Sequence, residues 1–413
     1  MEILFLSDNF PPESNAPANR TYEHAREWVT LGHSVTVITC APNFPNGEVY
    51  PGYQNKWYQV ESMEGIRVVR VKTYMTANEK FTRRVFDFLS FMIVGLVASL
   101  FQRKPDVIVA TSPQFFCGIA GALSALLKRV PFVLEVRDLW PESIVAIGVM
   151  PDRPSIKLLR LIEGWMYRRA SLIIVVSEAF RASISDRISN DEKIKVVLNG
   201  VDTNLFNQNP IIKPPPDLAK SLTDSVVVGY IGTHGAAHGL ITVLQAAKQL
   251  QAYPEIHFLL IGAGEKKHEV DAWADEHQLD NVTLLPHQPR SSIPGLMSLC
   301  DVALVPLRNL PLFRTVIPSK IFEYMAMGIP IVISVPEGAA TNIIKKSNCG
   351  LLVEPQNPEK LEQAILKLYQ DKALQVALGN NGQSASIEYR REQQARTMLN
   401  YINDTVQTVS QKR

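Results

Sequence analysis

The chain has 413 residues, of which 46% are hydrophobic, and its 42 basic and 40 acidic side chains give a formal net charge of +2. This length and composition indicate a globular protein of two or three domains, and the mixture of charges excludes a typical nucleic-acid-binding protein. The four cysteines form no CxxC or Cys/His pattern, which favours buried free thiols in a reducing cytosol. The N-terminal residues lack the basic and cleavage regions of a signal peptide, so we expect a cytoplasmic protein.

The first half of the chain alternates between strand-like apolar runs and helical patterns, beginning with a helix expected around Asn19–Leu31. Such alternation predicts a parallel sheet covered by helices. The expected strands are Ile3–Ser7, Ser34–Thr39, Val68–Val71, Val107–Ala110, Phe132–Glu135, Leu172–Ser177 and Lys195–Leu198.

One long uncharged run, Phe88–Phe101, stands out within this half. Its 14 residues are fewer than the roughly 20 that a membrane-spanning helix needs. Arg83 and Arg84 precede the run, and Arg103 and Lys104 follow it. The run is either a buried crossover helix or a helix that dips into an anionic membrane surface, and both interpretations stay open.

A segment rich in proline and polar residues, 209–225, interrupts the alternation and suits an interdomain linker. We therefore predict two Rossmann-like domains, at residues 1–208 and 226–380. Residues 381–413 are expected to form a helix that packs back toward the first domain. The strands expected in the second half are Val226–Ile231, His257–Ile261, Val282–Leu285, Val302–Pro306 and Ile331–Ser334.

The first strand of the second half leads into a glycine-rich turn, YIGTHGAAHGL. Gly232, Gly235 and Gly239 follow a strand and open a helix, which is the setting of a phosphate-binding turn. His234 and His238 could donate hydrogen bonds to a diphosphate there. The alternative is a plain turn, because a single glycine-rich turn is a weak signal.

A second motif in this half is PSKIFEYMAMGIP, residues 318–330. Ser319 is a candidate N-cap of a packed helix, and Gly328 before Pro330 indicates where the helix stops. Glu323 could bridge two ribose hydroxyls while Lys320 and backbone N–H groups face phosphate. The spacing alone is equally typical of a surface helix with a local Lys–Glu pair.

Two junctions in the first half follow expected strands and would lie at the ligand edge of its sheet. The loop SDNFPPESNAPANR contains Asn15 and Ala16, small residues that let backbone approach a ligand, although it could be an ordinary loop. In EVRDLWPES, Arg137, Asp138 and Glu142 could supply the acid and base of a group transfer. The alternative is an Arg137–Asp138 pair that steadies the loop.

Taken together, these segments resemble the retaining GT-B glycosyltransferases of family 4 over essentially the whole chain. The stretch YEHAREWVTLGHSVTVIT is similar to the helix and "GHxVxV" strand of that family, and LNGVDTNLF is similar to its "PNGVD…F" segment. Residues 318–330 resemble its nucleotide-sugar motif. The resemblance implies an α/β fold of GT-B architecture, with two Rossmann-like domains facing across a cleft.

The resemblance also implies roles for particular residues. Glu323 would bind the ribose hydroxyls, and the loop after the 282–285 strand would contact the base. We expect three catalytic residues: Asp138, Arg137 and Lys320. The residues expected to bind the acceptor are Asn15, Ala16 and Glu142. The residues expected to bind the donor are Gly232, Thr233, His234, His238, Pro286, His287, Val316, Ile317, Pro318, Ser319, Lys320 and Glu323.

The chain departs from the pattern of the family in three respects. The family commonly has a second glutamate eight positions before Glu323, where this chain has Thr315, which points to an altered donor sugar, N-acetylated or 6-deoxy. The usual Arg and Lys of the phosphate turn correspond to Thr233 and His238, so Lys320 or Arg314 would supply the missing cation. The N-terminal loop has Asn15–Ala16 where many members have Gly–Gly.

The sequence therefore predicts a retaining glycosyltransferase that moves a sugar from a nucleotide diphosphate, UDP-linked, onto a lipid-linked saccharide. The segments APNFPNGEVYPGY, VRDLWPES and FRTVIPSKIFEYM look most like bacterial enzymes of O-antigen or capsule synthesis, including N-acetyl-L-fucosamine transferases. No DxD sequence is placed to hold a metal, and no cofactor is expected beyond the nucleotide-sugar co-substrate. The expected location is the cytoplasm, at the inner face of the membrane. The alternatives are a UDP-sugar 2-epimerase and a non-catalytic sugar-nucleotide-binding partner.

Overall fold

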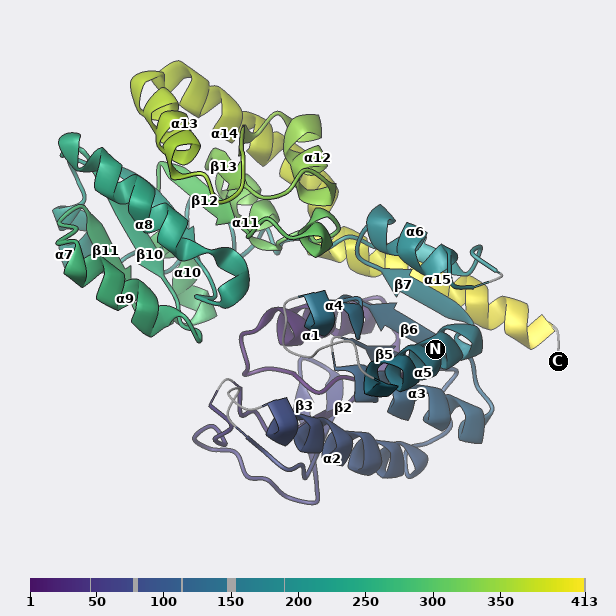
Figure 1. Ribbon diagram of the computed structural model, residues 1–413. Coiled ribbons are helices and arrows are strands. Elements are labelled where there is room, and N and C mark those ends of the chain that lie inside the picture. The colour runs from purple at the N-terminus through teal and green to yellow at the C-terminus, as the bar shows by residue number, and fades with distance from the viewer. Residues whose placement is uncertain (45, 77–80, 113, 147–153, 189, 412–413) are drawn as a thin grey trace. The chain divides into compact units, whose positions relative to one another are not determined.

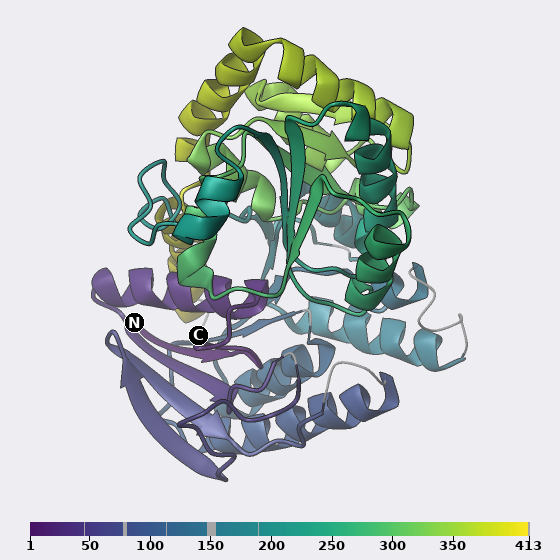
Figure 2. The same cartoon turned by 90° about the vertical axis from the view of Figure 1, so that its left-hand side faces the viewer.

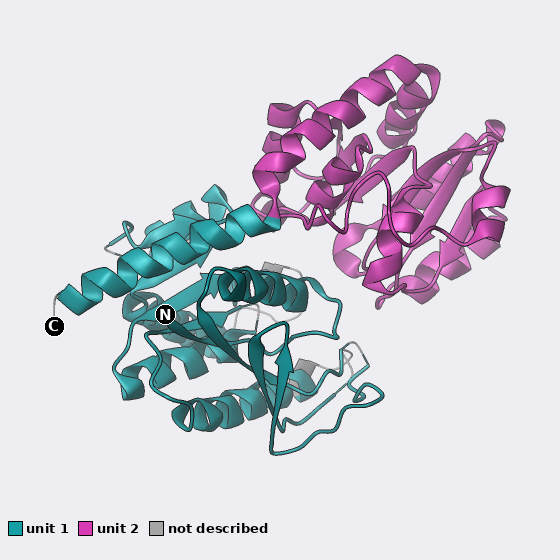
Figure 3. Cartoon of the chain, turned by 180° about the vertical axis from the view of Figure 1, so that it is seen from behind, with its two compact units in different colours: residues 1–198, 391–413 teal, residues 199–390 magenta. Residues whose placement is uncertain are grey.

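The computed structural model describes residues 1–44, 46–76, 81–112, 114–146, 154–188 and 190–411. The chain forms two compact units (Figure 3). Unit 1 contains residues 1–198 and 391–413, and unit 2 contains residues 199–390.

Unit 1 is built on a sheet to which the described residues contribute eight strands (Figure 1). All neighbouring strands pair in parallel except the first pair, which is antiparallel. The inner strands are apolar and buried on both sides, as is typical of parallel sheets. In sheet order the strands are β3 (Tyr58–Met63), β4 (Ile66–Val71), β2 (Ser34–Cys40), β1 (Glu2–Leu6), β5 (Val107–Thr111), β6 (Phe132–Val136), β7 (Leu172–Val175) and β8 (Ile194–Val196).

Helices cover both faces of this sheet (Figures 1 and 2). Ile3 and Phe5 of β1 pack on the face covered by α1 (Ala16–Thr30) and α15 (Arg391–Gln411). Because successive side chains of a strand point to opposite faces, Leu4 and Leu6 pack on the other face. The helices on that face are α2 (Phe81–Leu100), α3 (Phe115–Lys128), α5 (Pro154–Arg169) and α6 (Glu178–Ser185). The short helix α4 spans Glu142–Ala146.

Unit 2 repeats this plan with a parallel sheet, to which the described residues contribute six strands. In sheet order these are β11 (Val282–Leu285), β10 (Ile256–Ile261), β9 (Val226–Ile231), β12 (Val302–Pro306), β13 (Ile331–Ser334) and β14 (Gly350–Val353). The core on one face is formed with α8 (Leu240–Gln249), α9 (Lys267–Glu276) and α13 (Pro358–Gln370). The remaining helices are α7 (Pro216–Ser221), α10 (Ile293–Met297), α11 (Lys320–Met327), α12 (Ala339–Ser347) and α14 (Lys372–Ser386).

The direction of strand addition reverses once in each sheet. In unit 1 the reversal lies at β1, between β2 and β5, and in unit 2 it lies at β9, between β10 and β12. Open α/β sheets bind ligands beyond the carboxyl ends of the strands at such a switch point. The loops that follow β1 and β9 are therefore at the positions where a ligand is expected.

The unit boundaries differ from the expected limits at residues 208 and 380. The backbone N–H of Val201 donates to the carbonyl oxygen of Tyr389 at 2.9 Å, and Val201 also forms a bridge with Arg390. This pairing places residues 199–208 in unit 2. Helix α7 lies within the segment expected to be a linker, and α14 continues past the expected boundary.

The C-terminal helix α15 packs against α1 inside unit 1. The indole Nε1 of Trp28 donates to the carbonyl oxygen of Ala395 at 2.9 Å. Arg391 forms an ion pair with Glu23 at 2.6 Å. The last helix thus completes a core that the N-terminal strands begin.

Helix α2 contains the uncharged run 88–101 and has two different faces. Phe91 and Ala98 are buried in the core, as expected of a crossover helix, whereas Ile93 and Val97 are exposed. No helix among the described residues is long and apolar enough to cross a bilayer.

Candidate functional site

The loops that follow β9, β10 and β11 meet where the carboxyl-terminal ends of these strands lie, at one edge of the sheet of unit 2. The N–H of Gly232 donates to the carbonyl oxygen of Ile261 at 2.9 Å, and the N–H of Gly262 donates to Leu285 at 3.1 Å. Glycine is required at position 262, because a Cβ there would overlap the carbonyl group of Gly232. The loops after β9, β10 and β11 therefore form one continuous surface.

The glycine-rich turn after β9 ends in a helix start. Gly239 has φ 57° and ψ 43°, a left-handed conformation that glycine adopts without strain. It precedes α8, and no side chain of the described residues caps that helix. The positive end of the helix dipole therefore lies beside the turn, as in anion-binding sites.

Lys320 is the first residue of α11, and its side chain reaches back to β9. Its Nζ lies 3.9 Å from the ring centroid of Tyr230, close enough for a cation–π contact. The Nζ is shielded from solvent and has no hydrogen-bond partner among the described residues. Burial lowers the pKa of Lys320 to about 7, although the nearby Glu323 carboxylate opposes this shift. A Cβ at Gly232 would collide with the Nζ, so the glycine makes room for the ammonium group.

Two histidines surround the same tyrosine ring. The ring centroids of His234 and His238 lie 5.8 and 6.1 Å from that of Tyr230. Both nitrogens of His234 and the Nδ1 of His238 are buried without a hydrogen-bond partner among the described residues. Burial, assisted by neighbouring ammonium groups, lowers the pKa of His234 to about 4 and that of His238 to about 3. Near neutral pH both rings are therefore uncharged, and each carries one N–H donor.

We call His234, His238 and Lys320 the nitrogen cluster. Leaving a buried donor unpaired costs about 1–3 kcal/mol, and an unpaired charge costs more. Native proteins satisfy most such groups, so three of them around one ring need an explanation. An anion with several acceptor oxygens would supply the missing partners. The structure thus brings together three of the residues that the sequence assigned to a phosphate site.

Helix α11 is fixed beneath this cluster by its own buried face. Ile321 and Phe322 are buried, and the hydroxyl of Tyr324 accepts a hydrogen bond from the N–H of Ile231 at 3.0 Å. Glu323 lies one turn after Lys320 and is half-buried. Gly328, with φ 70°, ends the helix as the sequence predicted.

The segment before α11 differs in detail from expectation. Ser319 occupies the N-cap position, but its backbone is helical and its side chain makes no capping bond within the described part of the chain. Thr315, at the position where the resemblance led us to expect a glutamate, donates its hydroxyl to the carbonyl oxygen of Leu312 at 2.8 Å. Val316, Ile317 and Pro318 are half-buried beside it. Thr315 therefore closes the preceding turn.

Two expected donor residues lie apart from the nitrogen cluster. Pro286 and His287 follow β11 at the same sheet edge, and both side chains are exposed. The carbonyl oxygen of Pro286 accepts a hydrogen bond from the Gln288 amide at 3.2 Å. Among the described residues, neither of these side chains contacts the nitrogen cluster.

Thr233, another expected donor residue, fixes the tyrosine at the centre of the cluster. Its carbonyl oxygen accepts a hydrogen bond from the Tyr230 hydroxyl at 2.6 Å.

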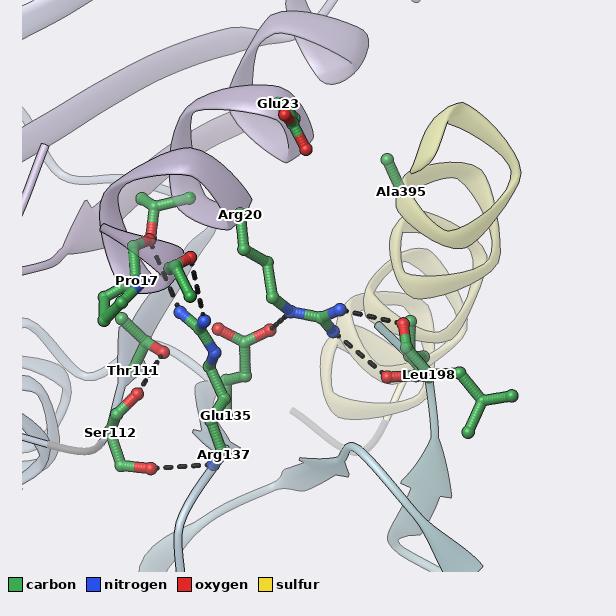
Figure 4. A network of polar contacts seen from close by, with 12 residues as sticks. Pro17, Arg20, Glu23, Thr111, Ser112, Glu135, Arg137, Leu198 and Ala395 are labelled. Atoms are coloured by element: carbon green, nitrogen blue, oxygen red, sulfur yellow. Dashed lines mark hydrogen bonds and ion pairs between the residues drawn. The ribbon is translucent and has the colours of Figure 1, made fainter. Parts of the chain in front are cut away.

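The ligand edge of unit 1 joins two of the predicted loops (Figure 4). Asn15 caps α1 by accepting the N–H of Ala18 at 2.9 Å. The guanidinium group of Arg137 donates to the carbonyl oxygens of Ala16 and Pro17 at 3.0 and 3.4 Å. Burial lowers the pKa of Arg137 to about 9. Arg137 thus holds the first turn of α1 against the loop that follows β6.

Asp138 and Glu142 have other partners. The described residues contain no Arg137–Asp138 ion pair, so that alternative interpretation of the loop is wrong; Asp138 instead accepts the Ser143 hydroxyl at 3.1 Å. Burial raises the pKa of Asp138. Glu142 forms ion pairs with Arg160 and Arg187 at 3.0 and 3.4 Å. Its carboxylate is therefore already engaged by two guanidinium groups of its own unit.

A buried ion pair behind this edge was not predicted. The Nε of Arg20 lies 2.7 Å from Oε1 of Glu135, and both side chains are almost completely buried. Arg20 also donates to the carbonyl oxygens of Leu198 and Val197 at 2.8 and 3.1 Å (Figure 4). The pair holds the last residues of unit 1 before the chain enters unit 2.

The sequence reasoning also missed three carboxyl groups near this edge. Burial raises the pKa of Asp8 and Glu13, and it raises that of Asp87 to about 7. Glu13 accepts the N–H groups of Asn43 and Phe44 at 2.8 and 2.9 Å, so it ties two loops together. Asp8 could have been noticed as the first acid after a buried strand.

Comparison with known protein families matches each half of the chain to a different model. A glycosyl transferase 4-like domain matches residues 15–200. The model described as glycosyl transferases group 1 matches residues 218–385. The two matches divide the chain close to the boundary between the units.

Individual relatives are similar at low identity. The chain is 25% identical over 377 residues to "Putative colanic acid biosynthesis glycosyl transferase WcaI" of Escherichia coli (strain K12), covering 88% of this chain and 91% of that protein. Sucrose-phosphate synthase from Thermosynechococcus elongatus superposes with a TM-score of 0.78 and 18% identity over 98% of each chain. Anabaena Alr3699/HepE in complex with UDP and glucose gives a TM-score of 0.69 and 17% identity over 98% and 99% of the two chains. These likenesses confirm the α/β GT-B architecture.

Proposed function

Because the chain is a glycosyltransferase of the GT-B fold, with a glycosyl transferase 4-like domain and a group 1 domain, we propose that it transfers a sugar from a UDP-linked donor to a lipid-linked saccharide. The reaction would belong to bacterial surface polysaccharide synthesis, at the inner face of the cytoplasmic membrane. The colanic acid relative supports the pathway class. The similar fold solved with UDP and glucose supports the donor class.

The observation that carries this proposal is the nitrogen cluster in unit 2. Its imidazole and ammonium groups are buried donors without acceptors among the described residues. The diphosphate of a nucleotide sugar would present several acceptor oxygens and a negative charge to them. Binding would therefore give the buried N–H donors the acceptors that they lack in the free protein. Because hydrogen bonds to a charged acceptor are stronger than those to a neutral one, the cluster would bind a diphosphate more tightly than an uncharged ligand.

The same groups suit the chemistry of glycosyl transfer. As the bond between C1 of the sugar and the diphosphate oxygen breaks, negative charge grows on the leaving diphosphate. Donors that are already in place stabilise this charge without reorganisation, and this effect usually supplies a large share of catalysis. Lys320 would act as the cation of the leaving group, so we expect no metal requirement.

We further propose that the reaction retains the configuration at C1. The acceptor hydroxyl would attack from the side that the diphosphate leaves, and its proton would pass to an oxygen of the leaving diphosphate. Glu323 would accept hydrogen bonds from the ribose hydroxyls. Thr315 lacks the carboxylate that normally binds the donor sugar, which favours an N-acetylated or 6-deoxy sugar.

Unit 1 would provide the acceptor side. The first turn of α1 presents Asn15 and Ala16 at the ligand edge, and Arg137 holds that turn in place. Asp138 lies on the neighbouring loop, where a carboxyl group with a raised pKa could contact an acceptor hydroxyl. Glu142, which is held by two arginines, would act through the position of that loop.

The test is a donor-binding and turnover experiment on Glu323→Ala. UDP affinity is measured by calorimetry, and turnover is measured with a panel of nucleotide sugars, with and without lipid-diphosphate acceptors. We expect the variant to bind UDP about 10–100-fold more weakly, because one charged acceptor of two hydrogen bonds is lost. The matched control is Glu276→Ala, an exposed acid on α9.

Three results would count against the proposal. Unchanged UDP affinity and turnover in Glu323→Ala would remove the site assignment. Conversion of a UDP-sugar to its epimer without any acceptor would identify a 2-epimerase instead. Tight UDP binding without turnover of any donor and acceptor would indicate a non-catalytic binding protein.

A further inference from the structure

Helix α2 carries a stripe of large apolar side chains that are exposed on its outer face. Phe86 is 65% exposed, Ile93 57%, Val97 47% and Leu100 42%. Their spacing of seven, four and three positions places them on one side of the helix. The stripe extends over about 21 Å at ~1.5 Å per residue. Phe101, which follows the helix, is 82% exposed.

The end of α3 widens this stripe. The Nζ of Lys128 donates to the carbonyl oxygens of Leu100 and Gln102 at 3.2 and 2.7 Å, so the last turns of α2 and α3 are tied together. Leu126 and Leu127 on the last turn of α3 are 47% and 59% exposed. Both helices lie on the same face of the sheet (Figures 1 and 2). We call the exposed apolar residues of α2, Phe101, Leu126 and Leu127 the α2 surface.

Basic side chains stand at both ends of the α2 surface. Arg83 is exposed at the start of α2, Arg103 and Lys104 are exposed just after its end, and Arg129 is exposed after α3. The acid within the helix, Asp87, is half-buried, and its pKa is raised to about 7, chiefly by burial. The surface therefore combines apolar area with positive charge.

That combination decides between possible occupants. A second copy of the same surface would bring like charges together, which disfavours pairing. A stable interface with another protein would be expected to have an apolar centre with few charged residues, which does not match the basic ends of the α2 surface. An anionic bilayer offers both a boundary of acyl chains for the apolar stripe and phosphate groups for the basic ends.

We propose that the α2 surface binds the anionic surface of a lipid bilayer, with α2 lying in the plane of the interface. Phe86, Ile93, Val97 and Phe101 enter the boundary between headgroups and acyl chains. The arginines and lysine at the two ends contact lipid phosphates. The proposal extends the proposed function by naming the membrane that a lipid-linked acceptor requires, but its evidence is the surface of unit 1 alone.

The test uses co-sedimentation of the full chain with vesicles of phosphatidylcholine alone or mixed with phosphatidylglycerol. We expect binding to the mixed vesicles at low salt, weaker binding at high salt, and little binding to phosphatidylcholine alone. The double variant Phe86→Ser/Phe101→Ser should lower the binding constant at least tenfold, because each removed ring takes substantial apolar area from the interface. Arg103→Gln/Lys104→Gln should lower it about 30-fold, at roughly 1 kcal/mol per basic residue, and should flatten the salt dependence.

Matched controls come from unit 2. Ile211→Ser/Val376→Ser removes two exposed apolar side chains, and Lys248→Gln/Lys360→Gln removes two exposed cations. Neither control should change vesicle binding. Thermal unfolding and UDP affinity should be unchanged in every variant, since all of the altered residues are exposed and none belongs to the nitrogen cluster.

The proposal is overturned if the protein does not sediment with anionic vesicles at low salt, or if the α2-surface variants bind as well as the controls. It is also overturned if light scattering shows a dimer that the variants abolish while vesicle binding is absent. Loss of UDP binding with intact vesicle binding would contradict the proposed function and leave this inference standing.

Discussion

The ligand edges of the two units differ in whether their buried basic side chains have hydrogen-bond or ion-pair partners. In unit 2, Lys320 and its two histidines lack hydrogen-bond partners among the described residues. In unit 1, the guanidinium of Arg20 is paired with Glu135 and two carbonyl oxygens, and Arg137 donates to two more. A paired buried charge fixes the structure around it, whereas an unpaired one is a cost that only a ligand removes. We infer from this difference that the edge of unit 1 has a structural role and that the edge of unit 2 is the proposed donor site.

The pKa shifts follow the same division. Burial lowers the pKa of Lys320 to about 7, so its charged and neutral forms are present in similar amounts near physiological pH. Glu135 is completely buried, but its pKa is lowered, because the attraction of Arg20 and Arg137 together with hydrogen bonds to Thr111 and Arg20 outweighs desolvation. Glu135 is therefore ionised at all moderate pH values, as a structural partner should be.

The largest expected effect tests the scaffold. Arg20→Met would leave the Glu135 carboxylate buried without its closest cation, so we expect the free energy of unfolding to fall by about 3–5 kcal/mol. Urea denaturation measures this change. UDP affinity at a temperature where the variant is folded should stay within twofold of the native value. A stable Arg20→Met protein with weakened UDP binding would reverse the assignment of the two edges.

The next effect tests the site. Lys320→Met removes an ammonium group that has no hydrogen-bond partner among the described residues and that we propose contacts the diphosphate. UDP affinity should therefore fall about 10–100-fold, the value of a charged hydrogen bond. The free energy of unfolding should stay the same or rise, because no buried partner is left behind. Calorimetry and urea denaturation provide the two readouts. Lys248→Met, at an exposed position on α8, is the control; a destabilised Lys320→Met protein with native UDP affinity would contradict the comparison.

A third prediction concerns pH. Because the pKa of Lys320 in the free protein is about 7, UDP affinity should decrease above pH 7, by at most tenfold per pH unit. The sign for stability is opposite: the folded pKa lies below the unfolded value of about 10.4, so the contribution of Lys320 to stability rises between pH 7 and about 10. Comparing native protein with Lys320→Met isolates both trends. Parallel pH profiles of UDP affinity in the two proteins would exclude a role for the Lys320 charge.

The smallest effect lies within unit 1. Arg396 pairs with Glu27 at 2.7 Å; the arginine side chain is 54% exposed, whereas that of Glu27 is 10% exposed. Because the arginine side of the pair is open to water, Arg396→Met should lower the free energy of unfolding by only about 1 kcal/mol. Urea denaturation alongside Arg20→Met gives the comparison. Equal losses in the two variants would show that burial does not set the strength of these pairs.

Much of the fold could be predicted because strands that are buried on both sides have continuous apolar sequences, which are easily recognised. The exceptions have local reasons. β3 lies at the sheet edge and alternates exposed with half-buried residues, so its apolar content is diluted. β14 has only four residues and begins with glycine. The true unit boundaries depend on the pairing of Val201 with Tyr389, which are distant in sequence, and no local composition marks them.

The site divides in the same manner. His234, His238 and Lys320 belong to two short motifs, whose spacing alone left a plain turn and a surface helix open, and the resemblance to a family assigned both motifs to the donor. The Arg20–Glu135 pair joins residues 115 positions apart, and neither residue stands in a distinctive pattern. Asp87 was hidden because one acid at the start of an apolar helix looks like an ordinary surface residue. Short sequence motifs therefore indicated the proposed ligand-binding residues. Ion pairs between residues far apart in the sequence could be identified only from the folded structure.

The return of the chain to unit 1 has a consequence for how the protein is made. Residues 199–390 are continuous, so all of unit 2 is synthesised before helix α15 of unit 1. Unit 1 must wait for α15, whose Ala395, Met398 and Leu399 fill the core around β1. On the ribosome the second unit can therefore finish folding before the first, the reverse of the usual N-terminal-first order.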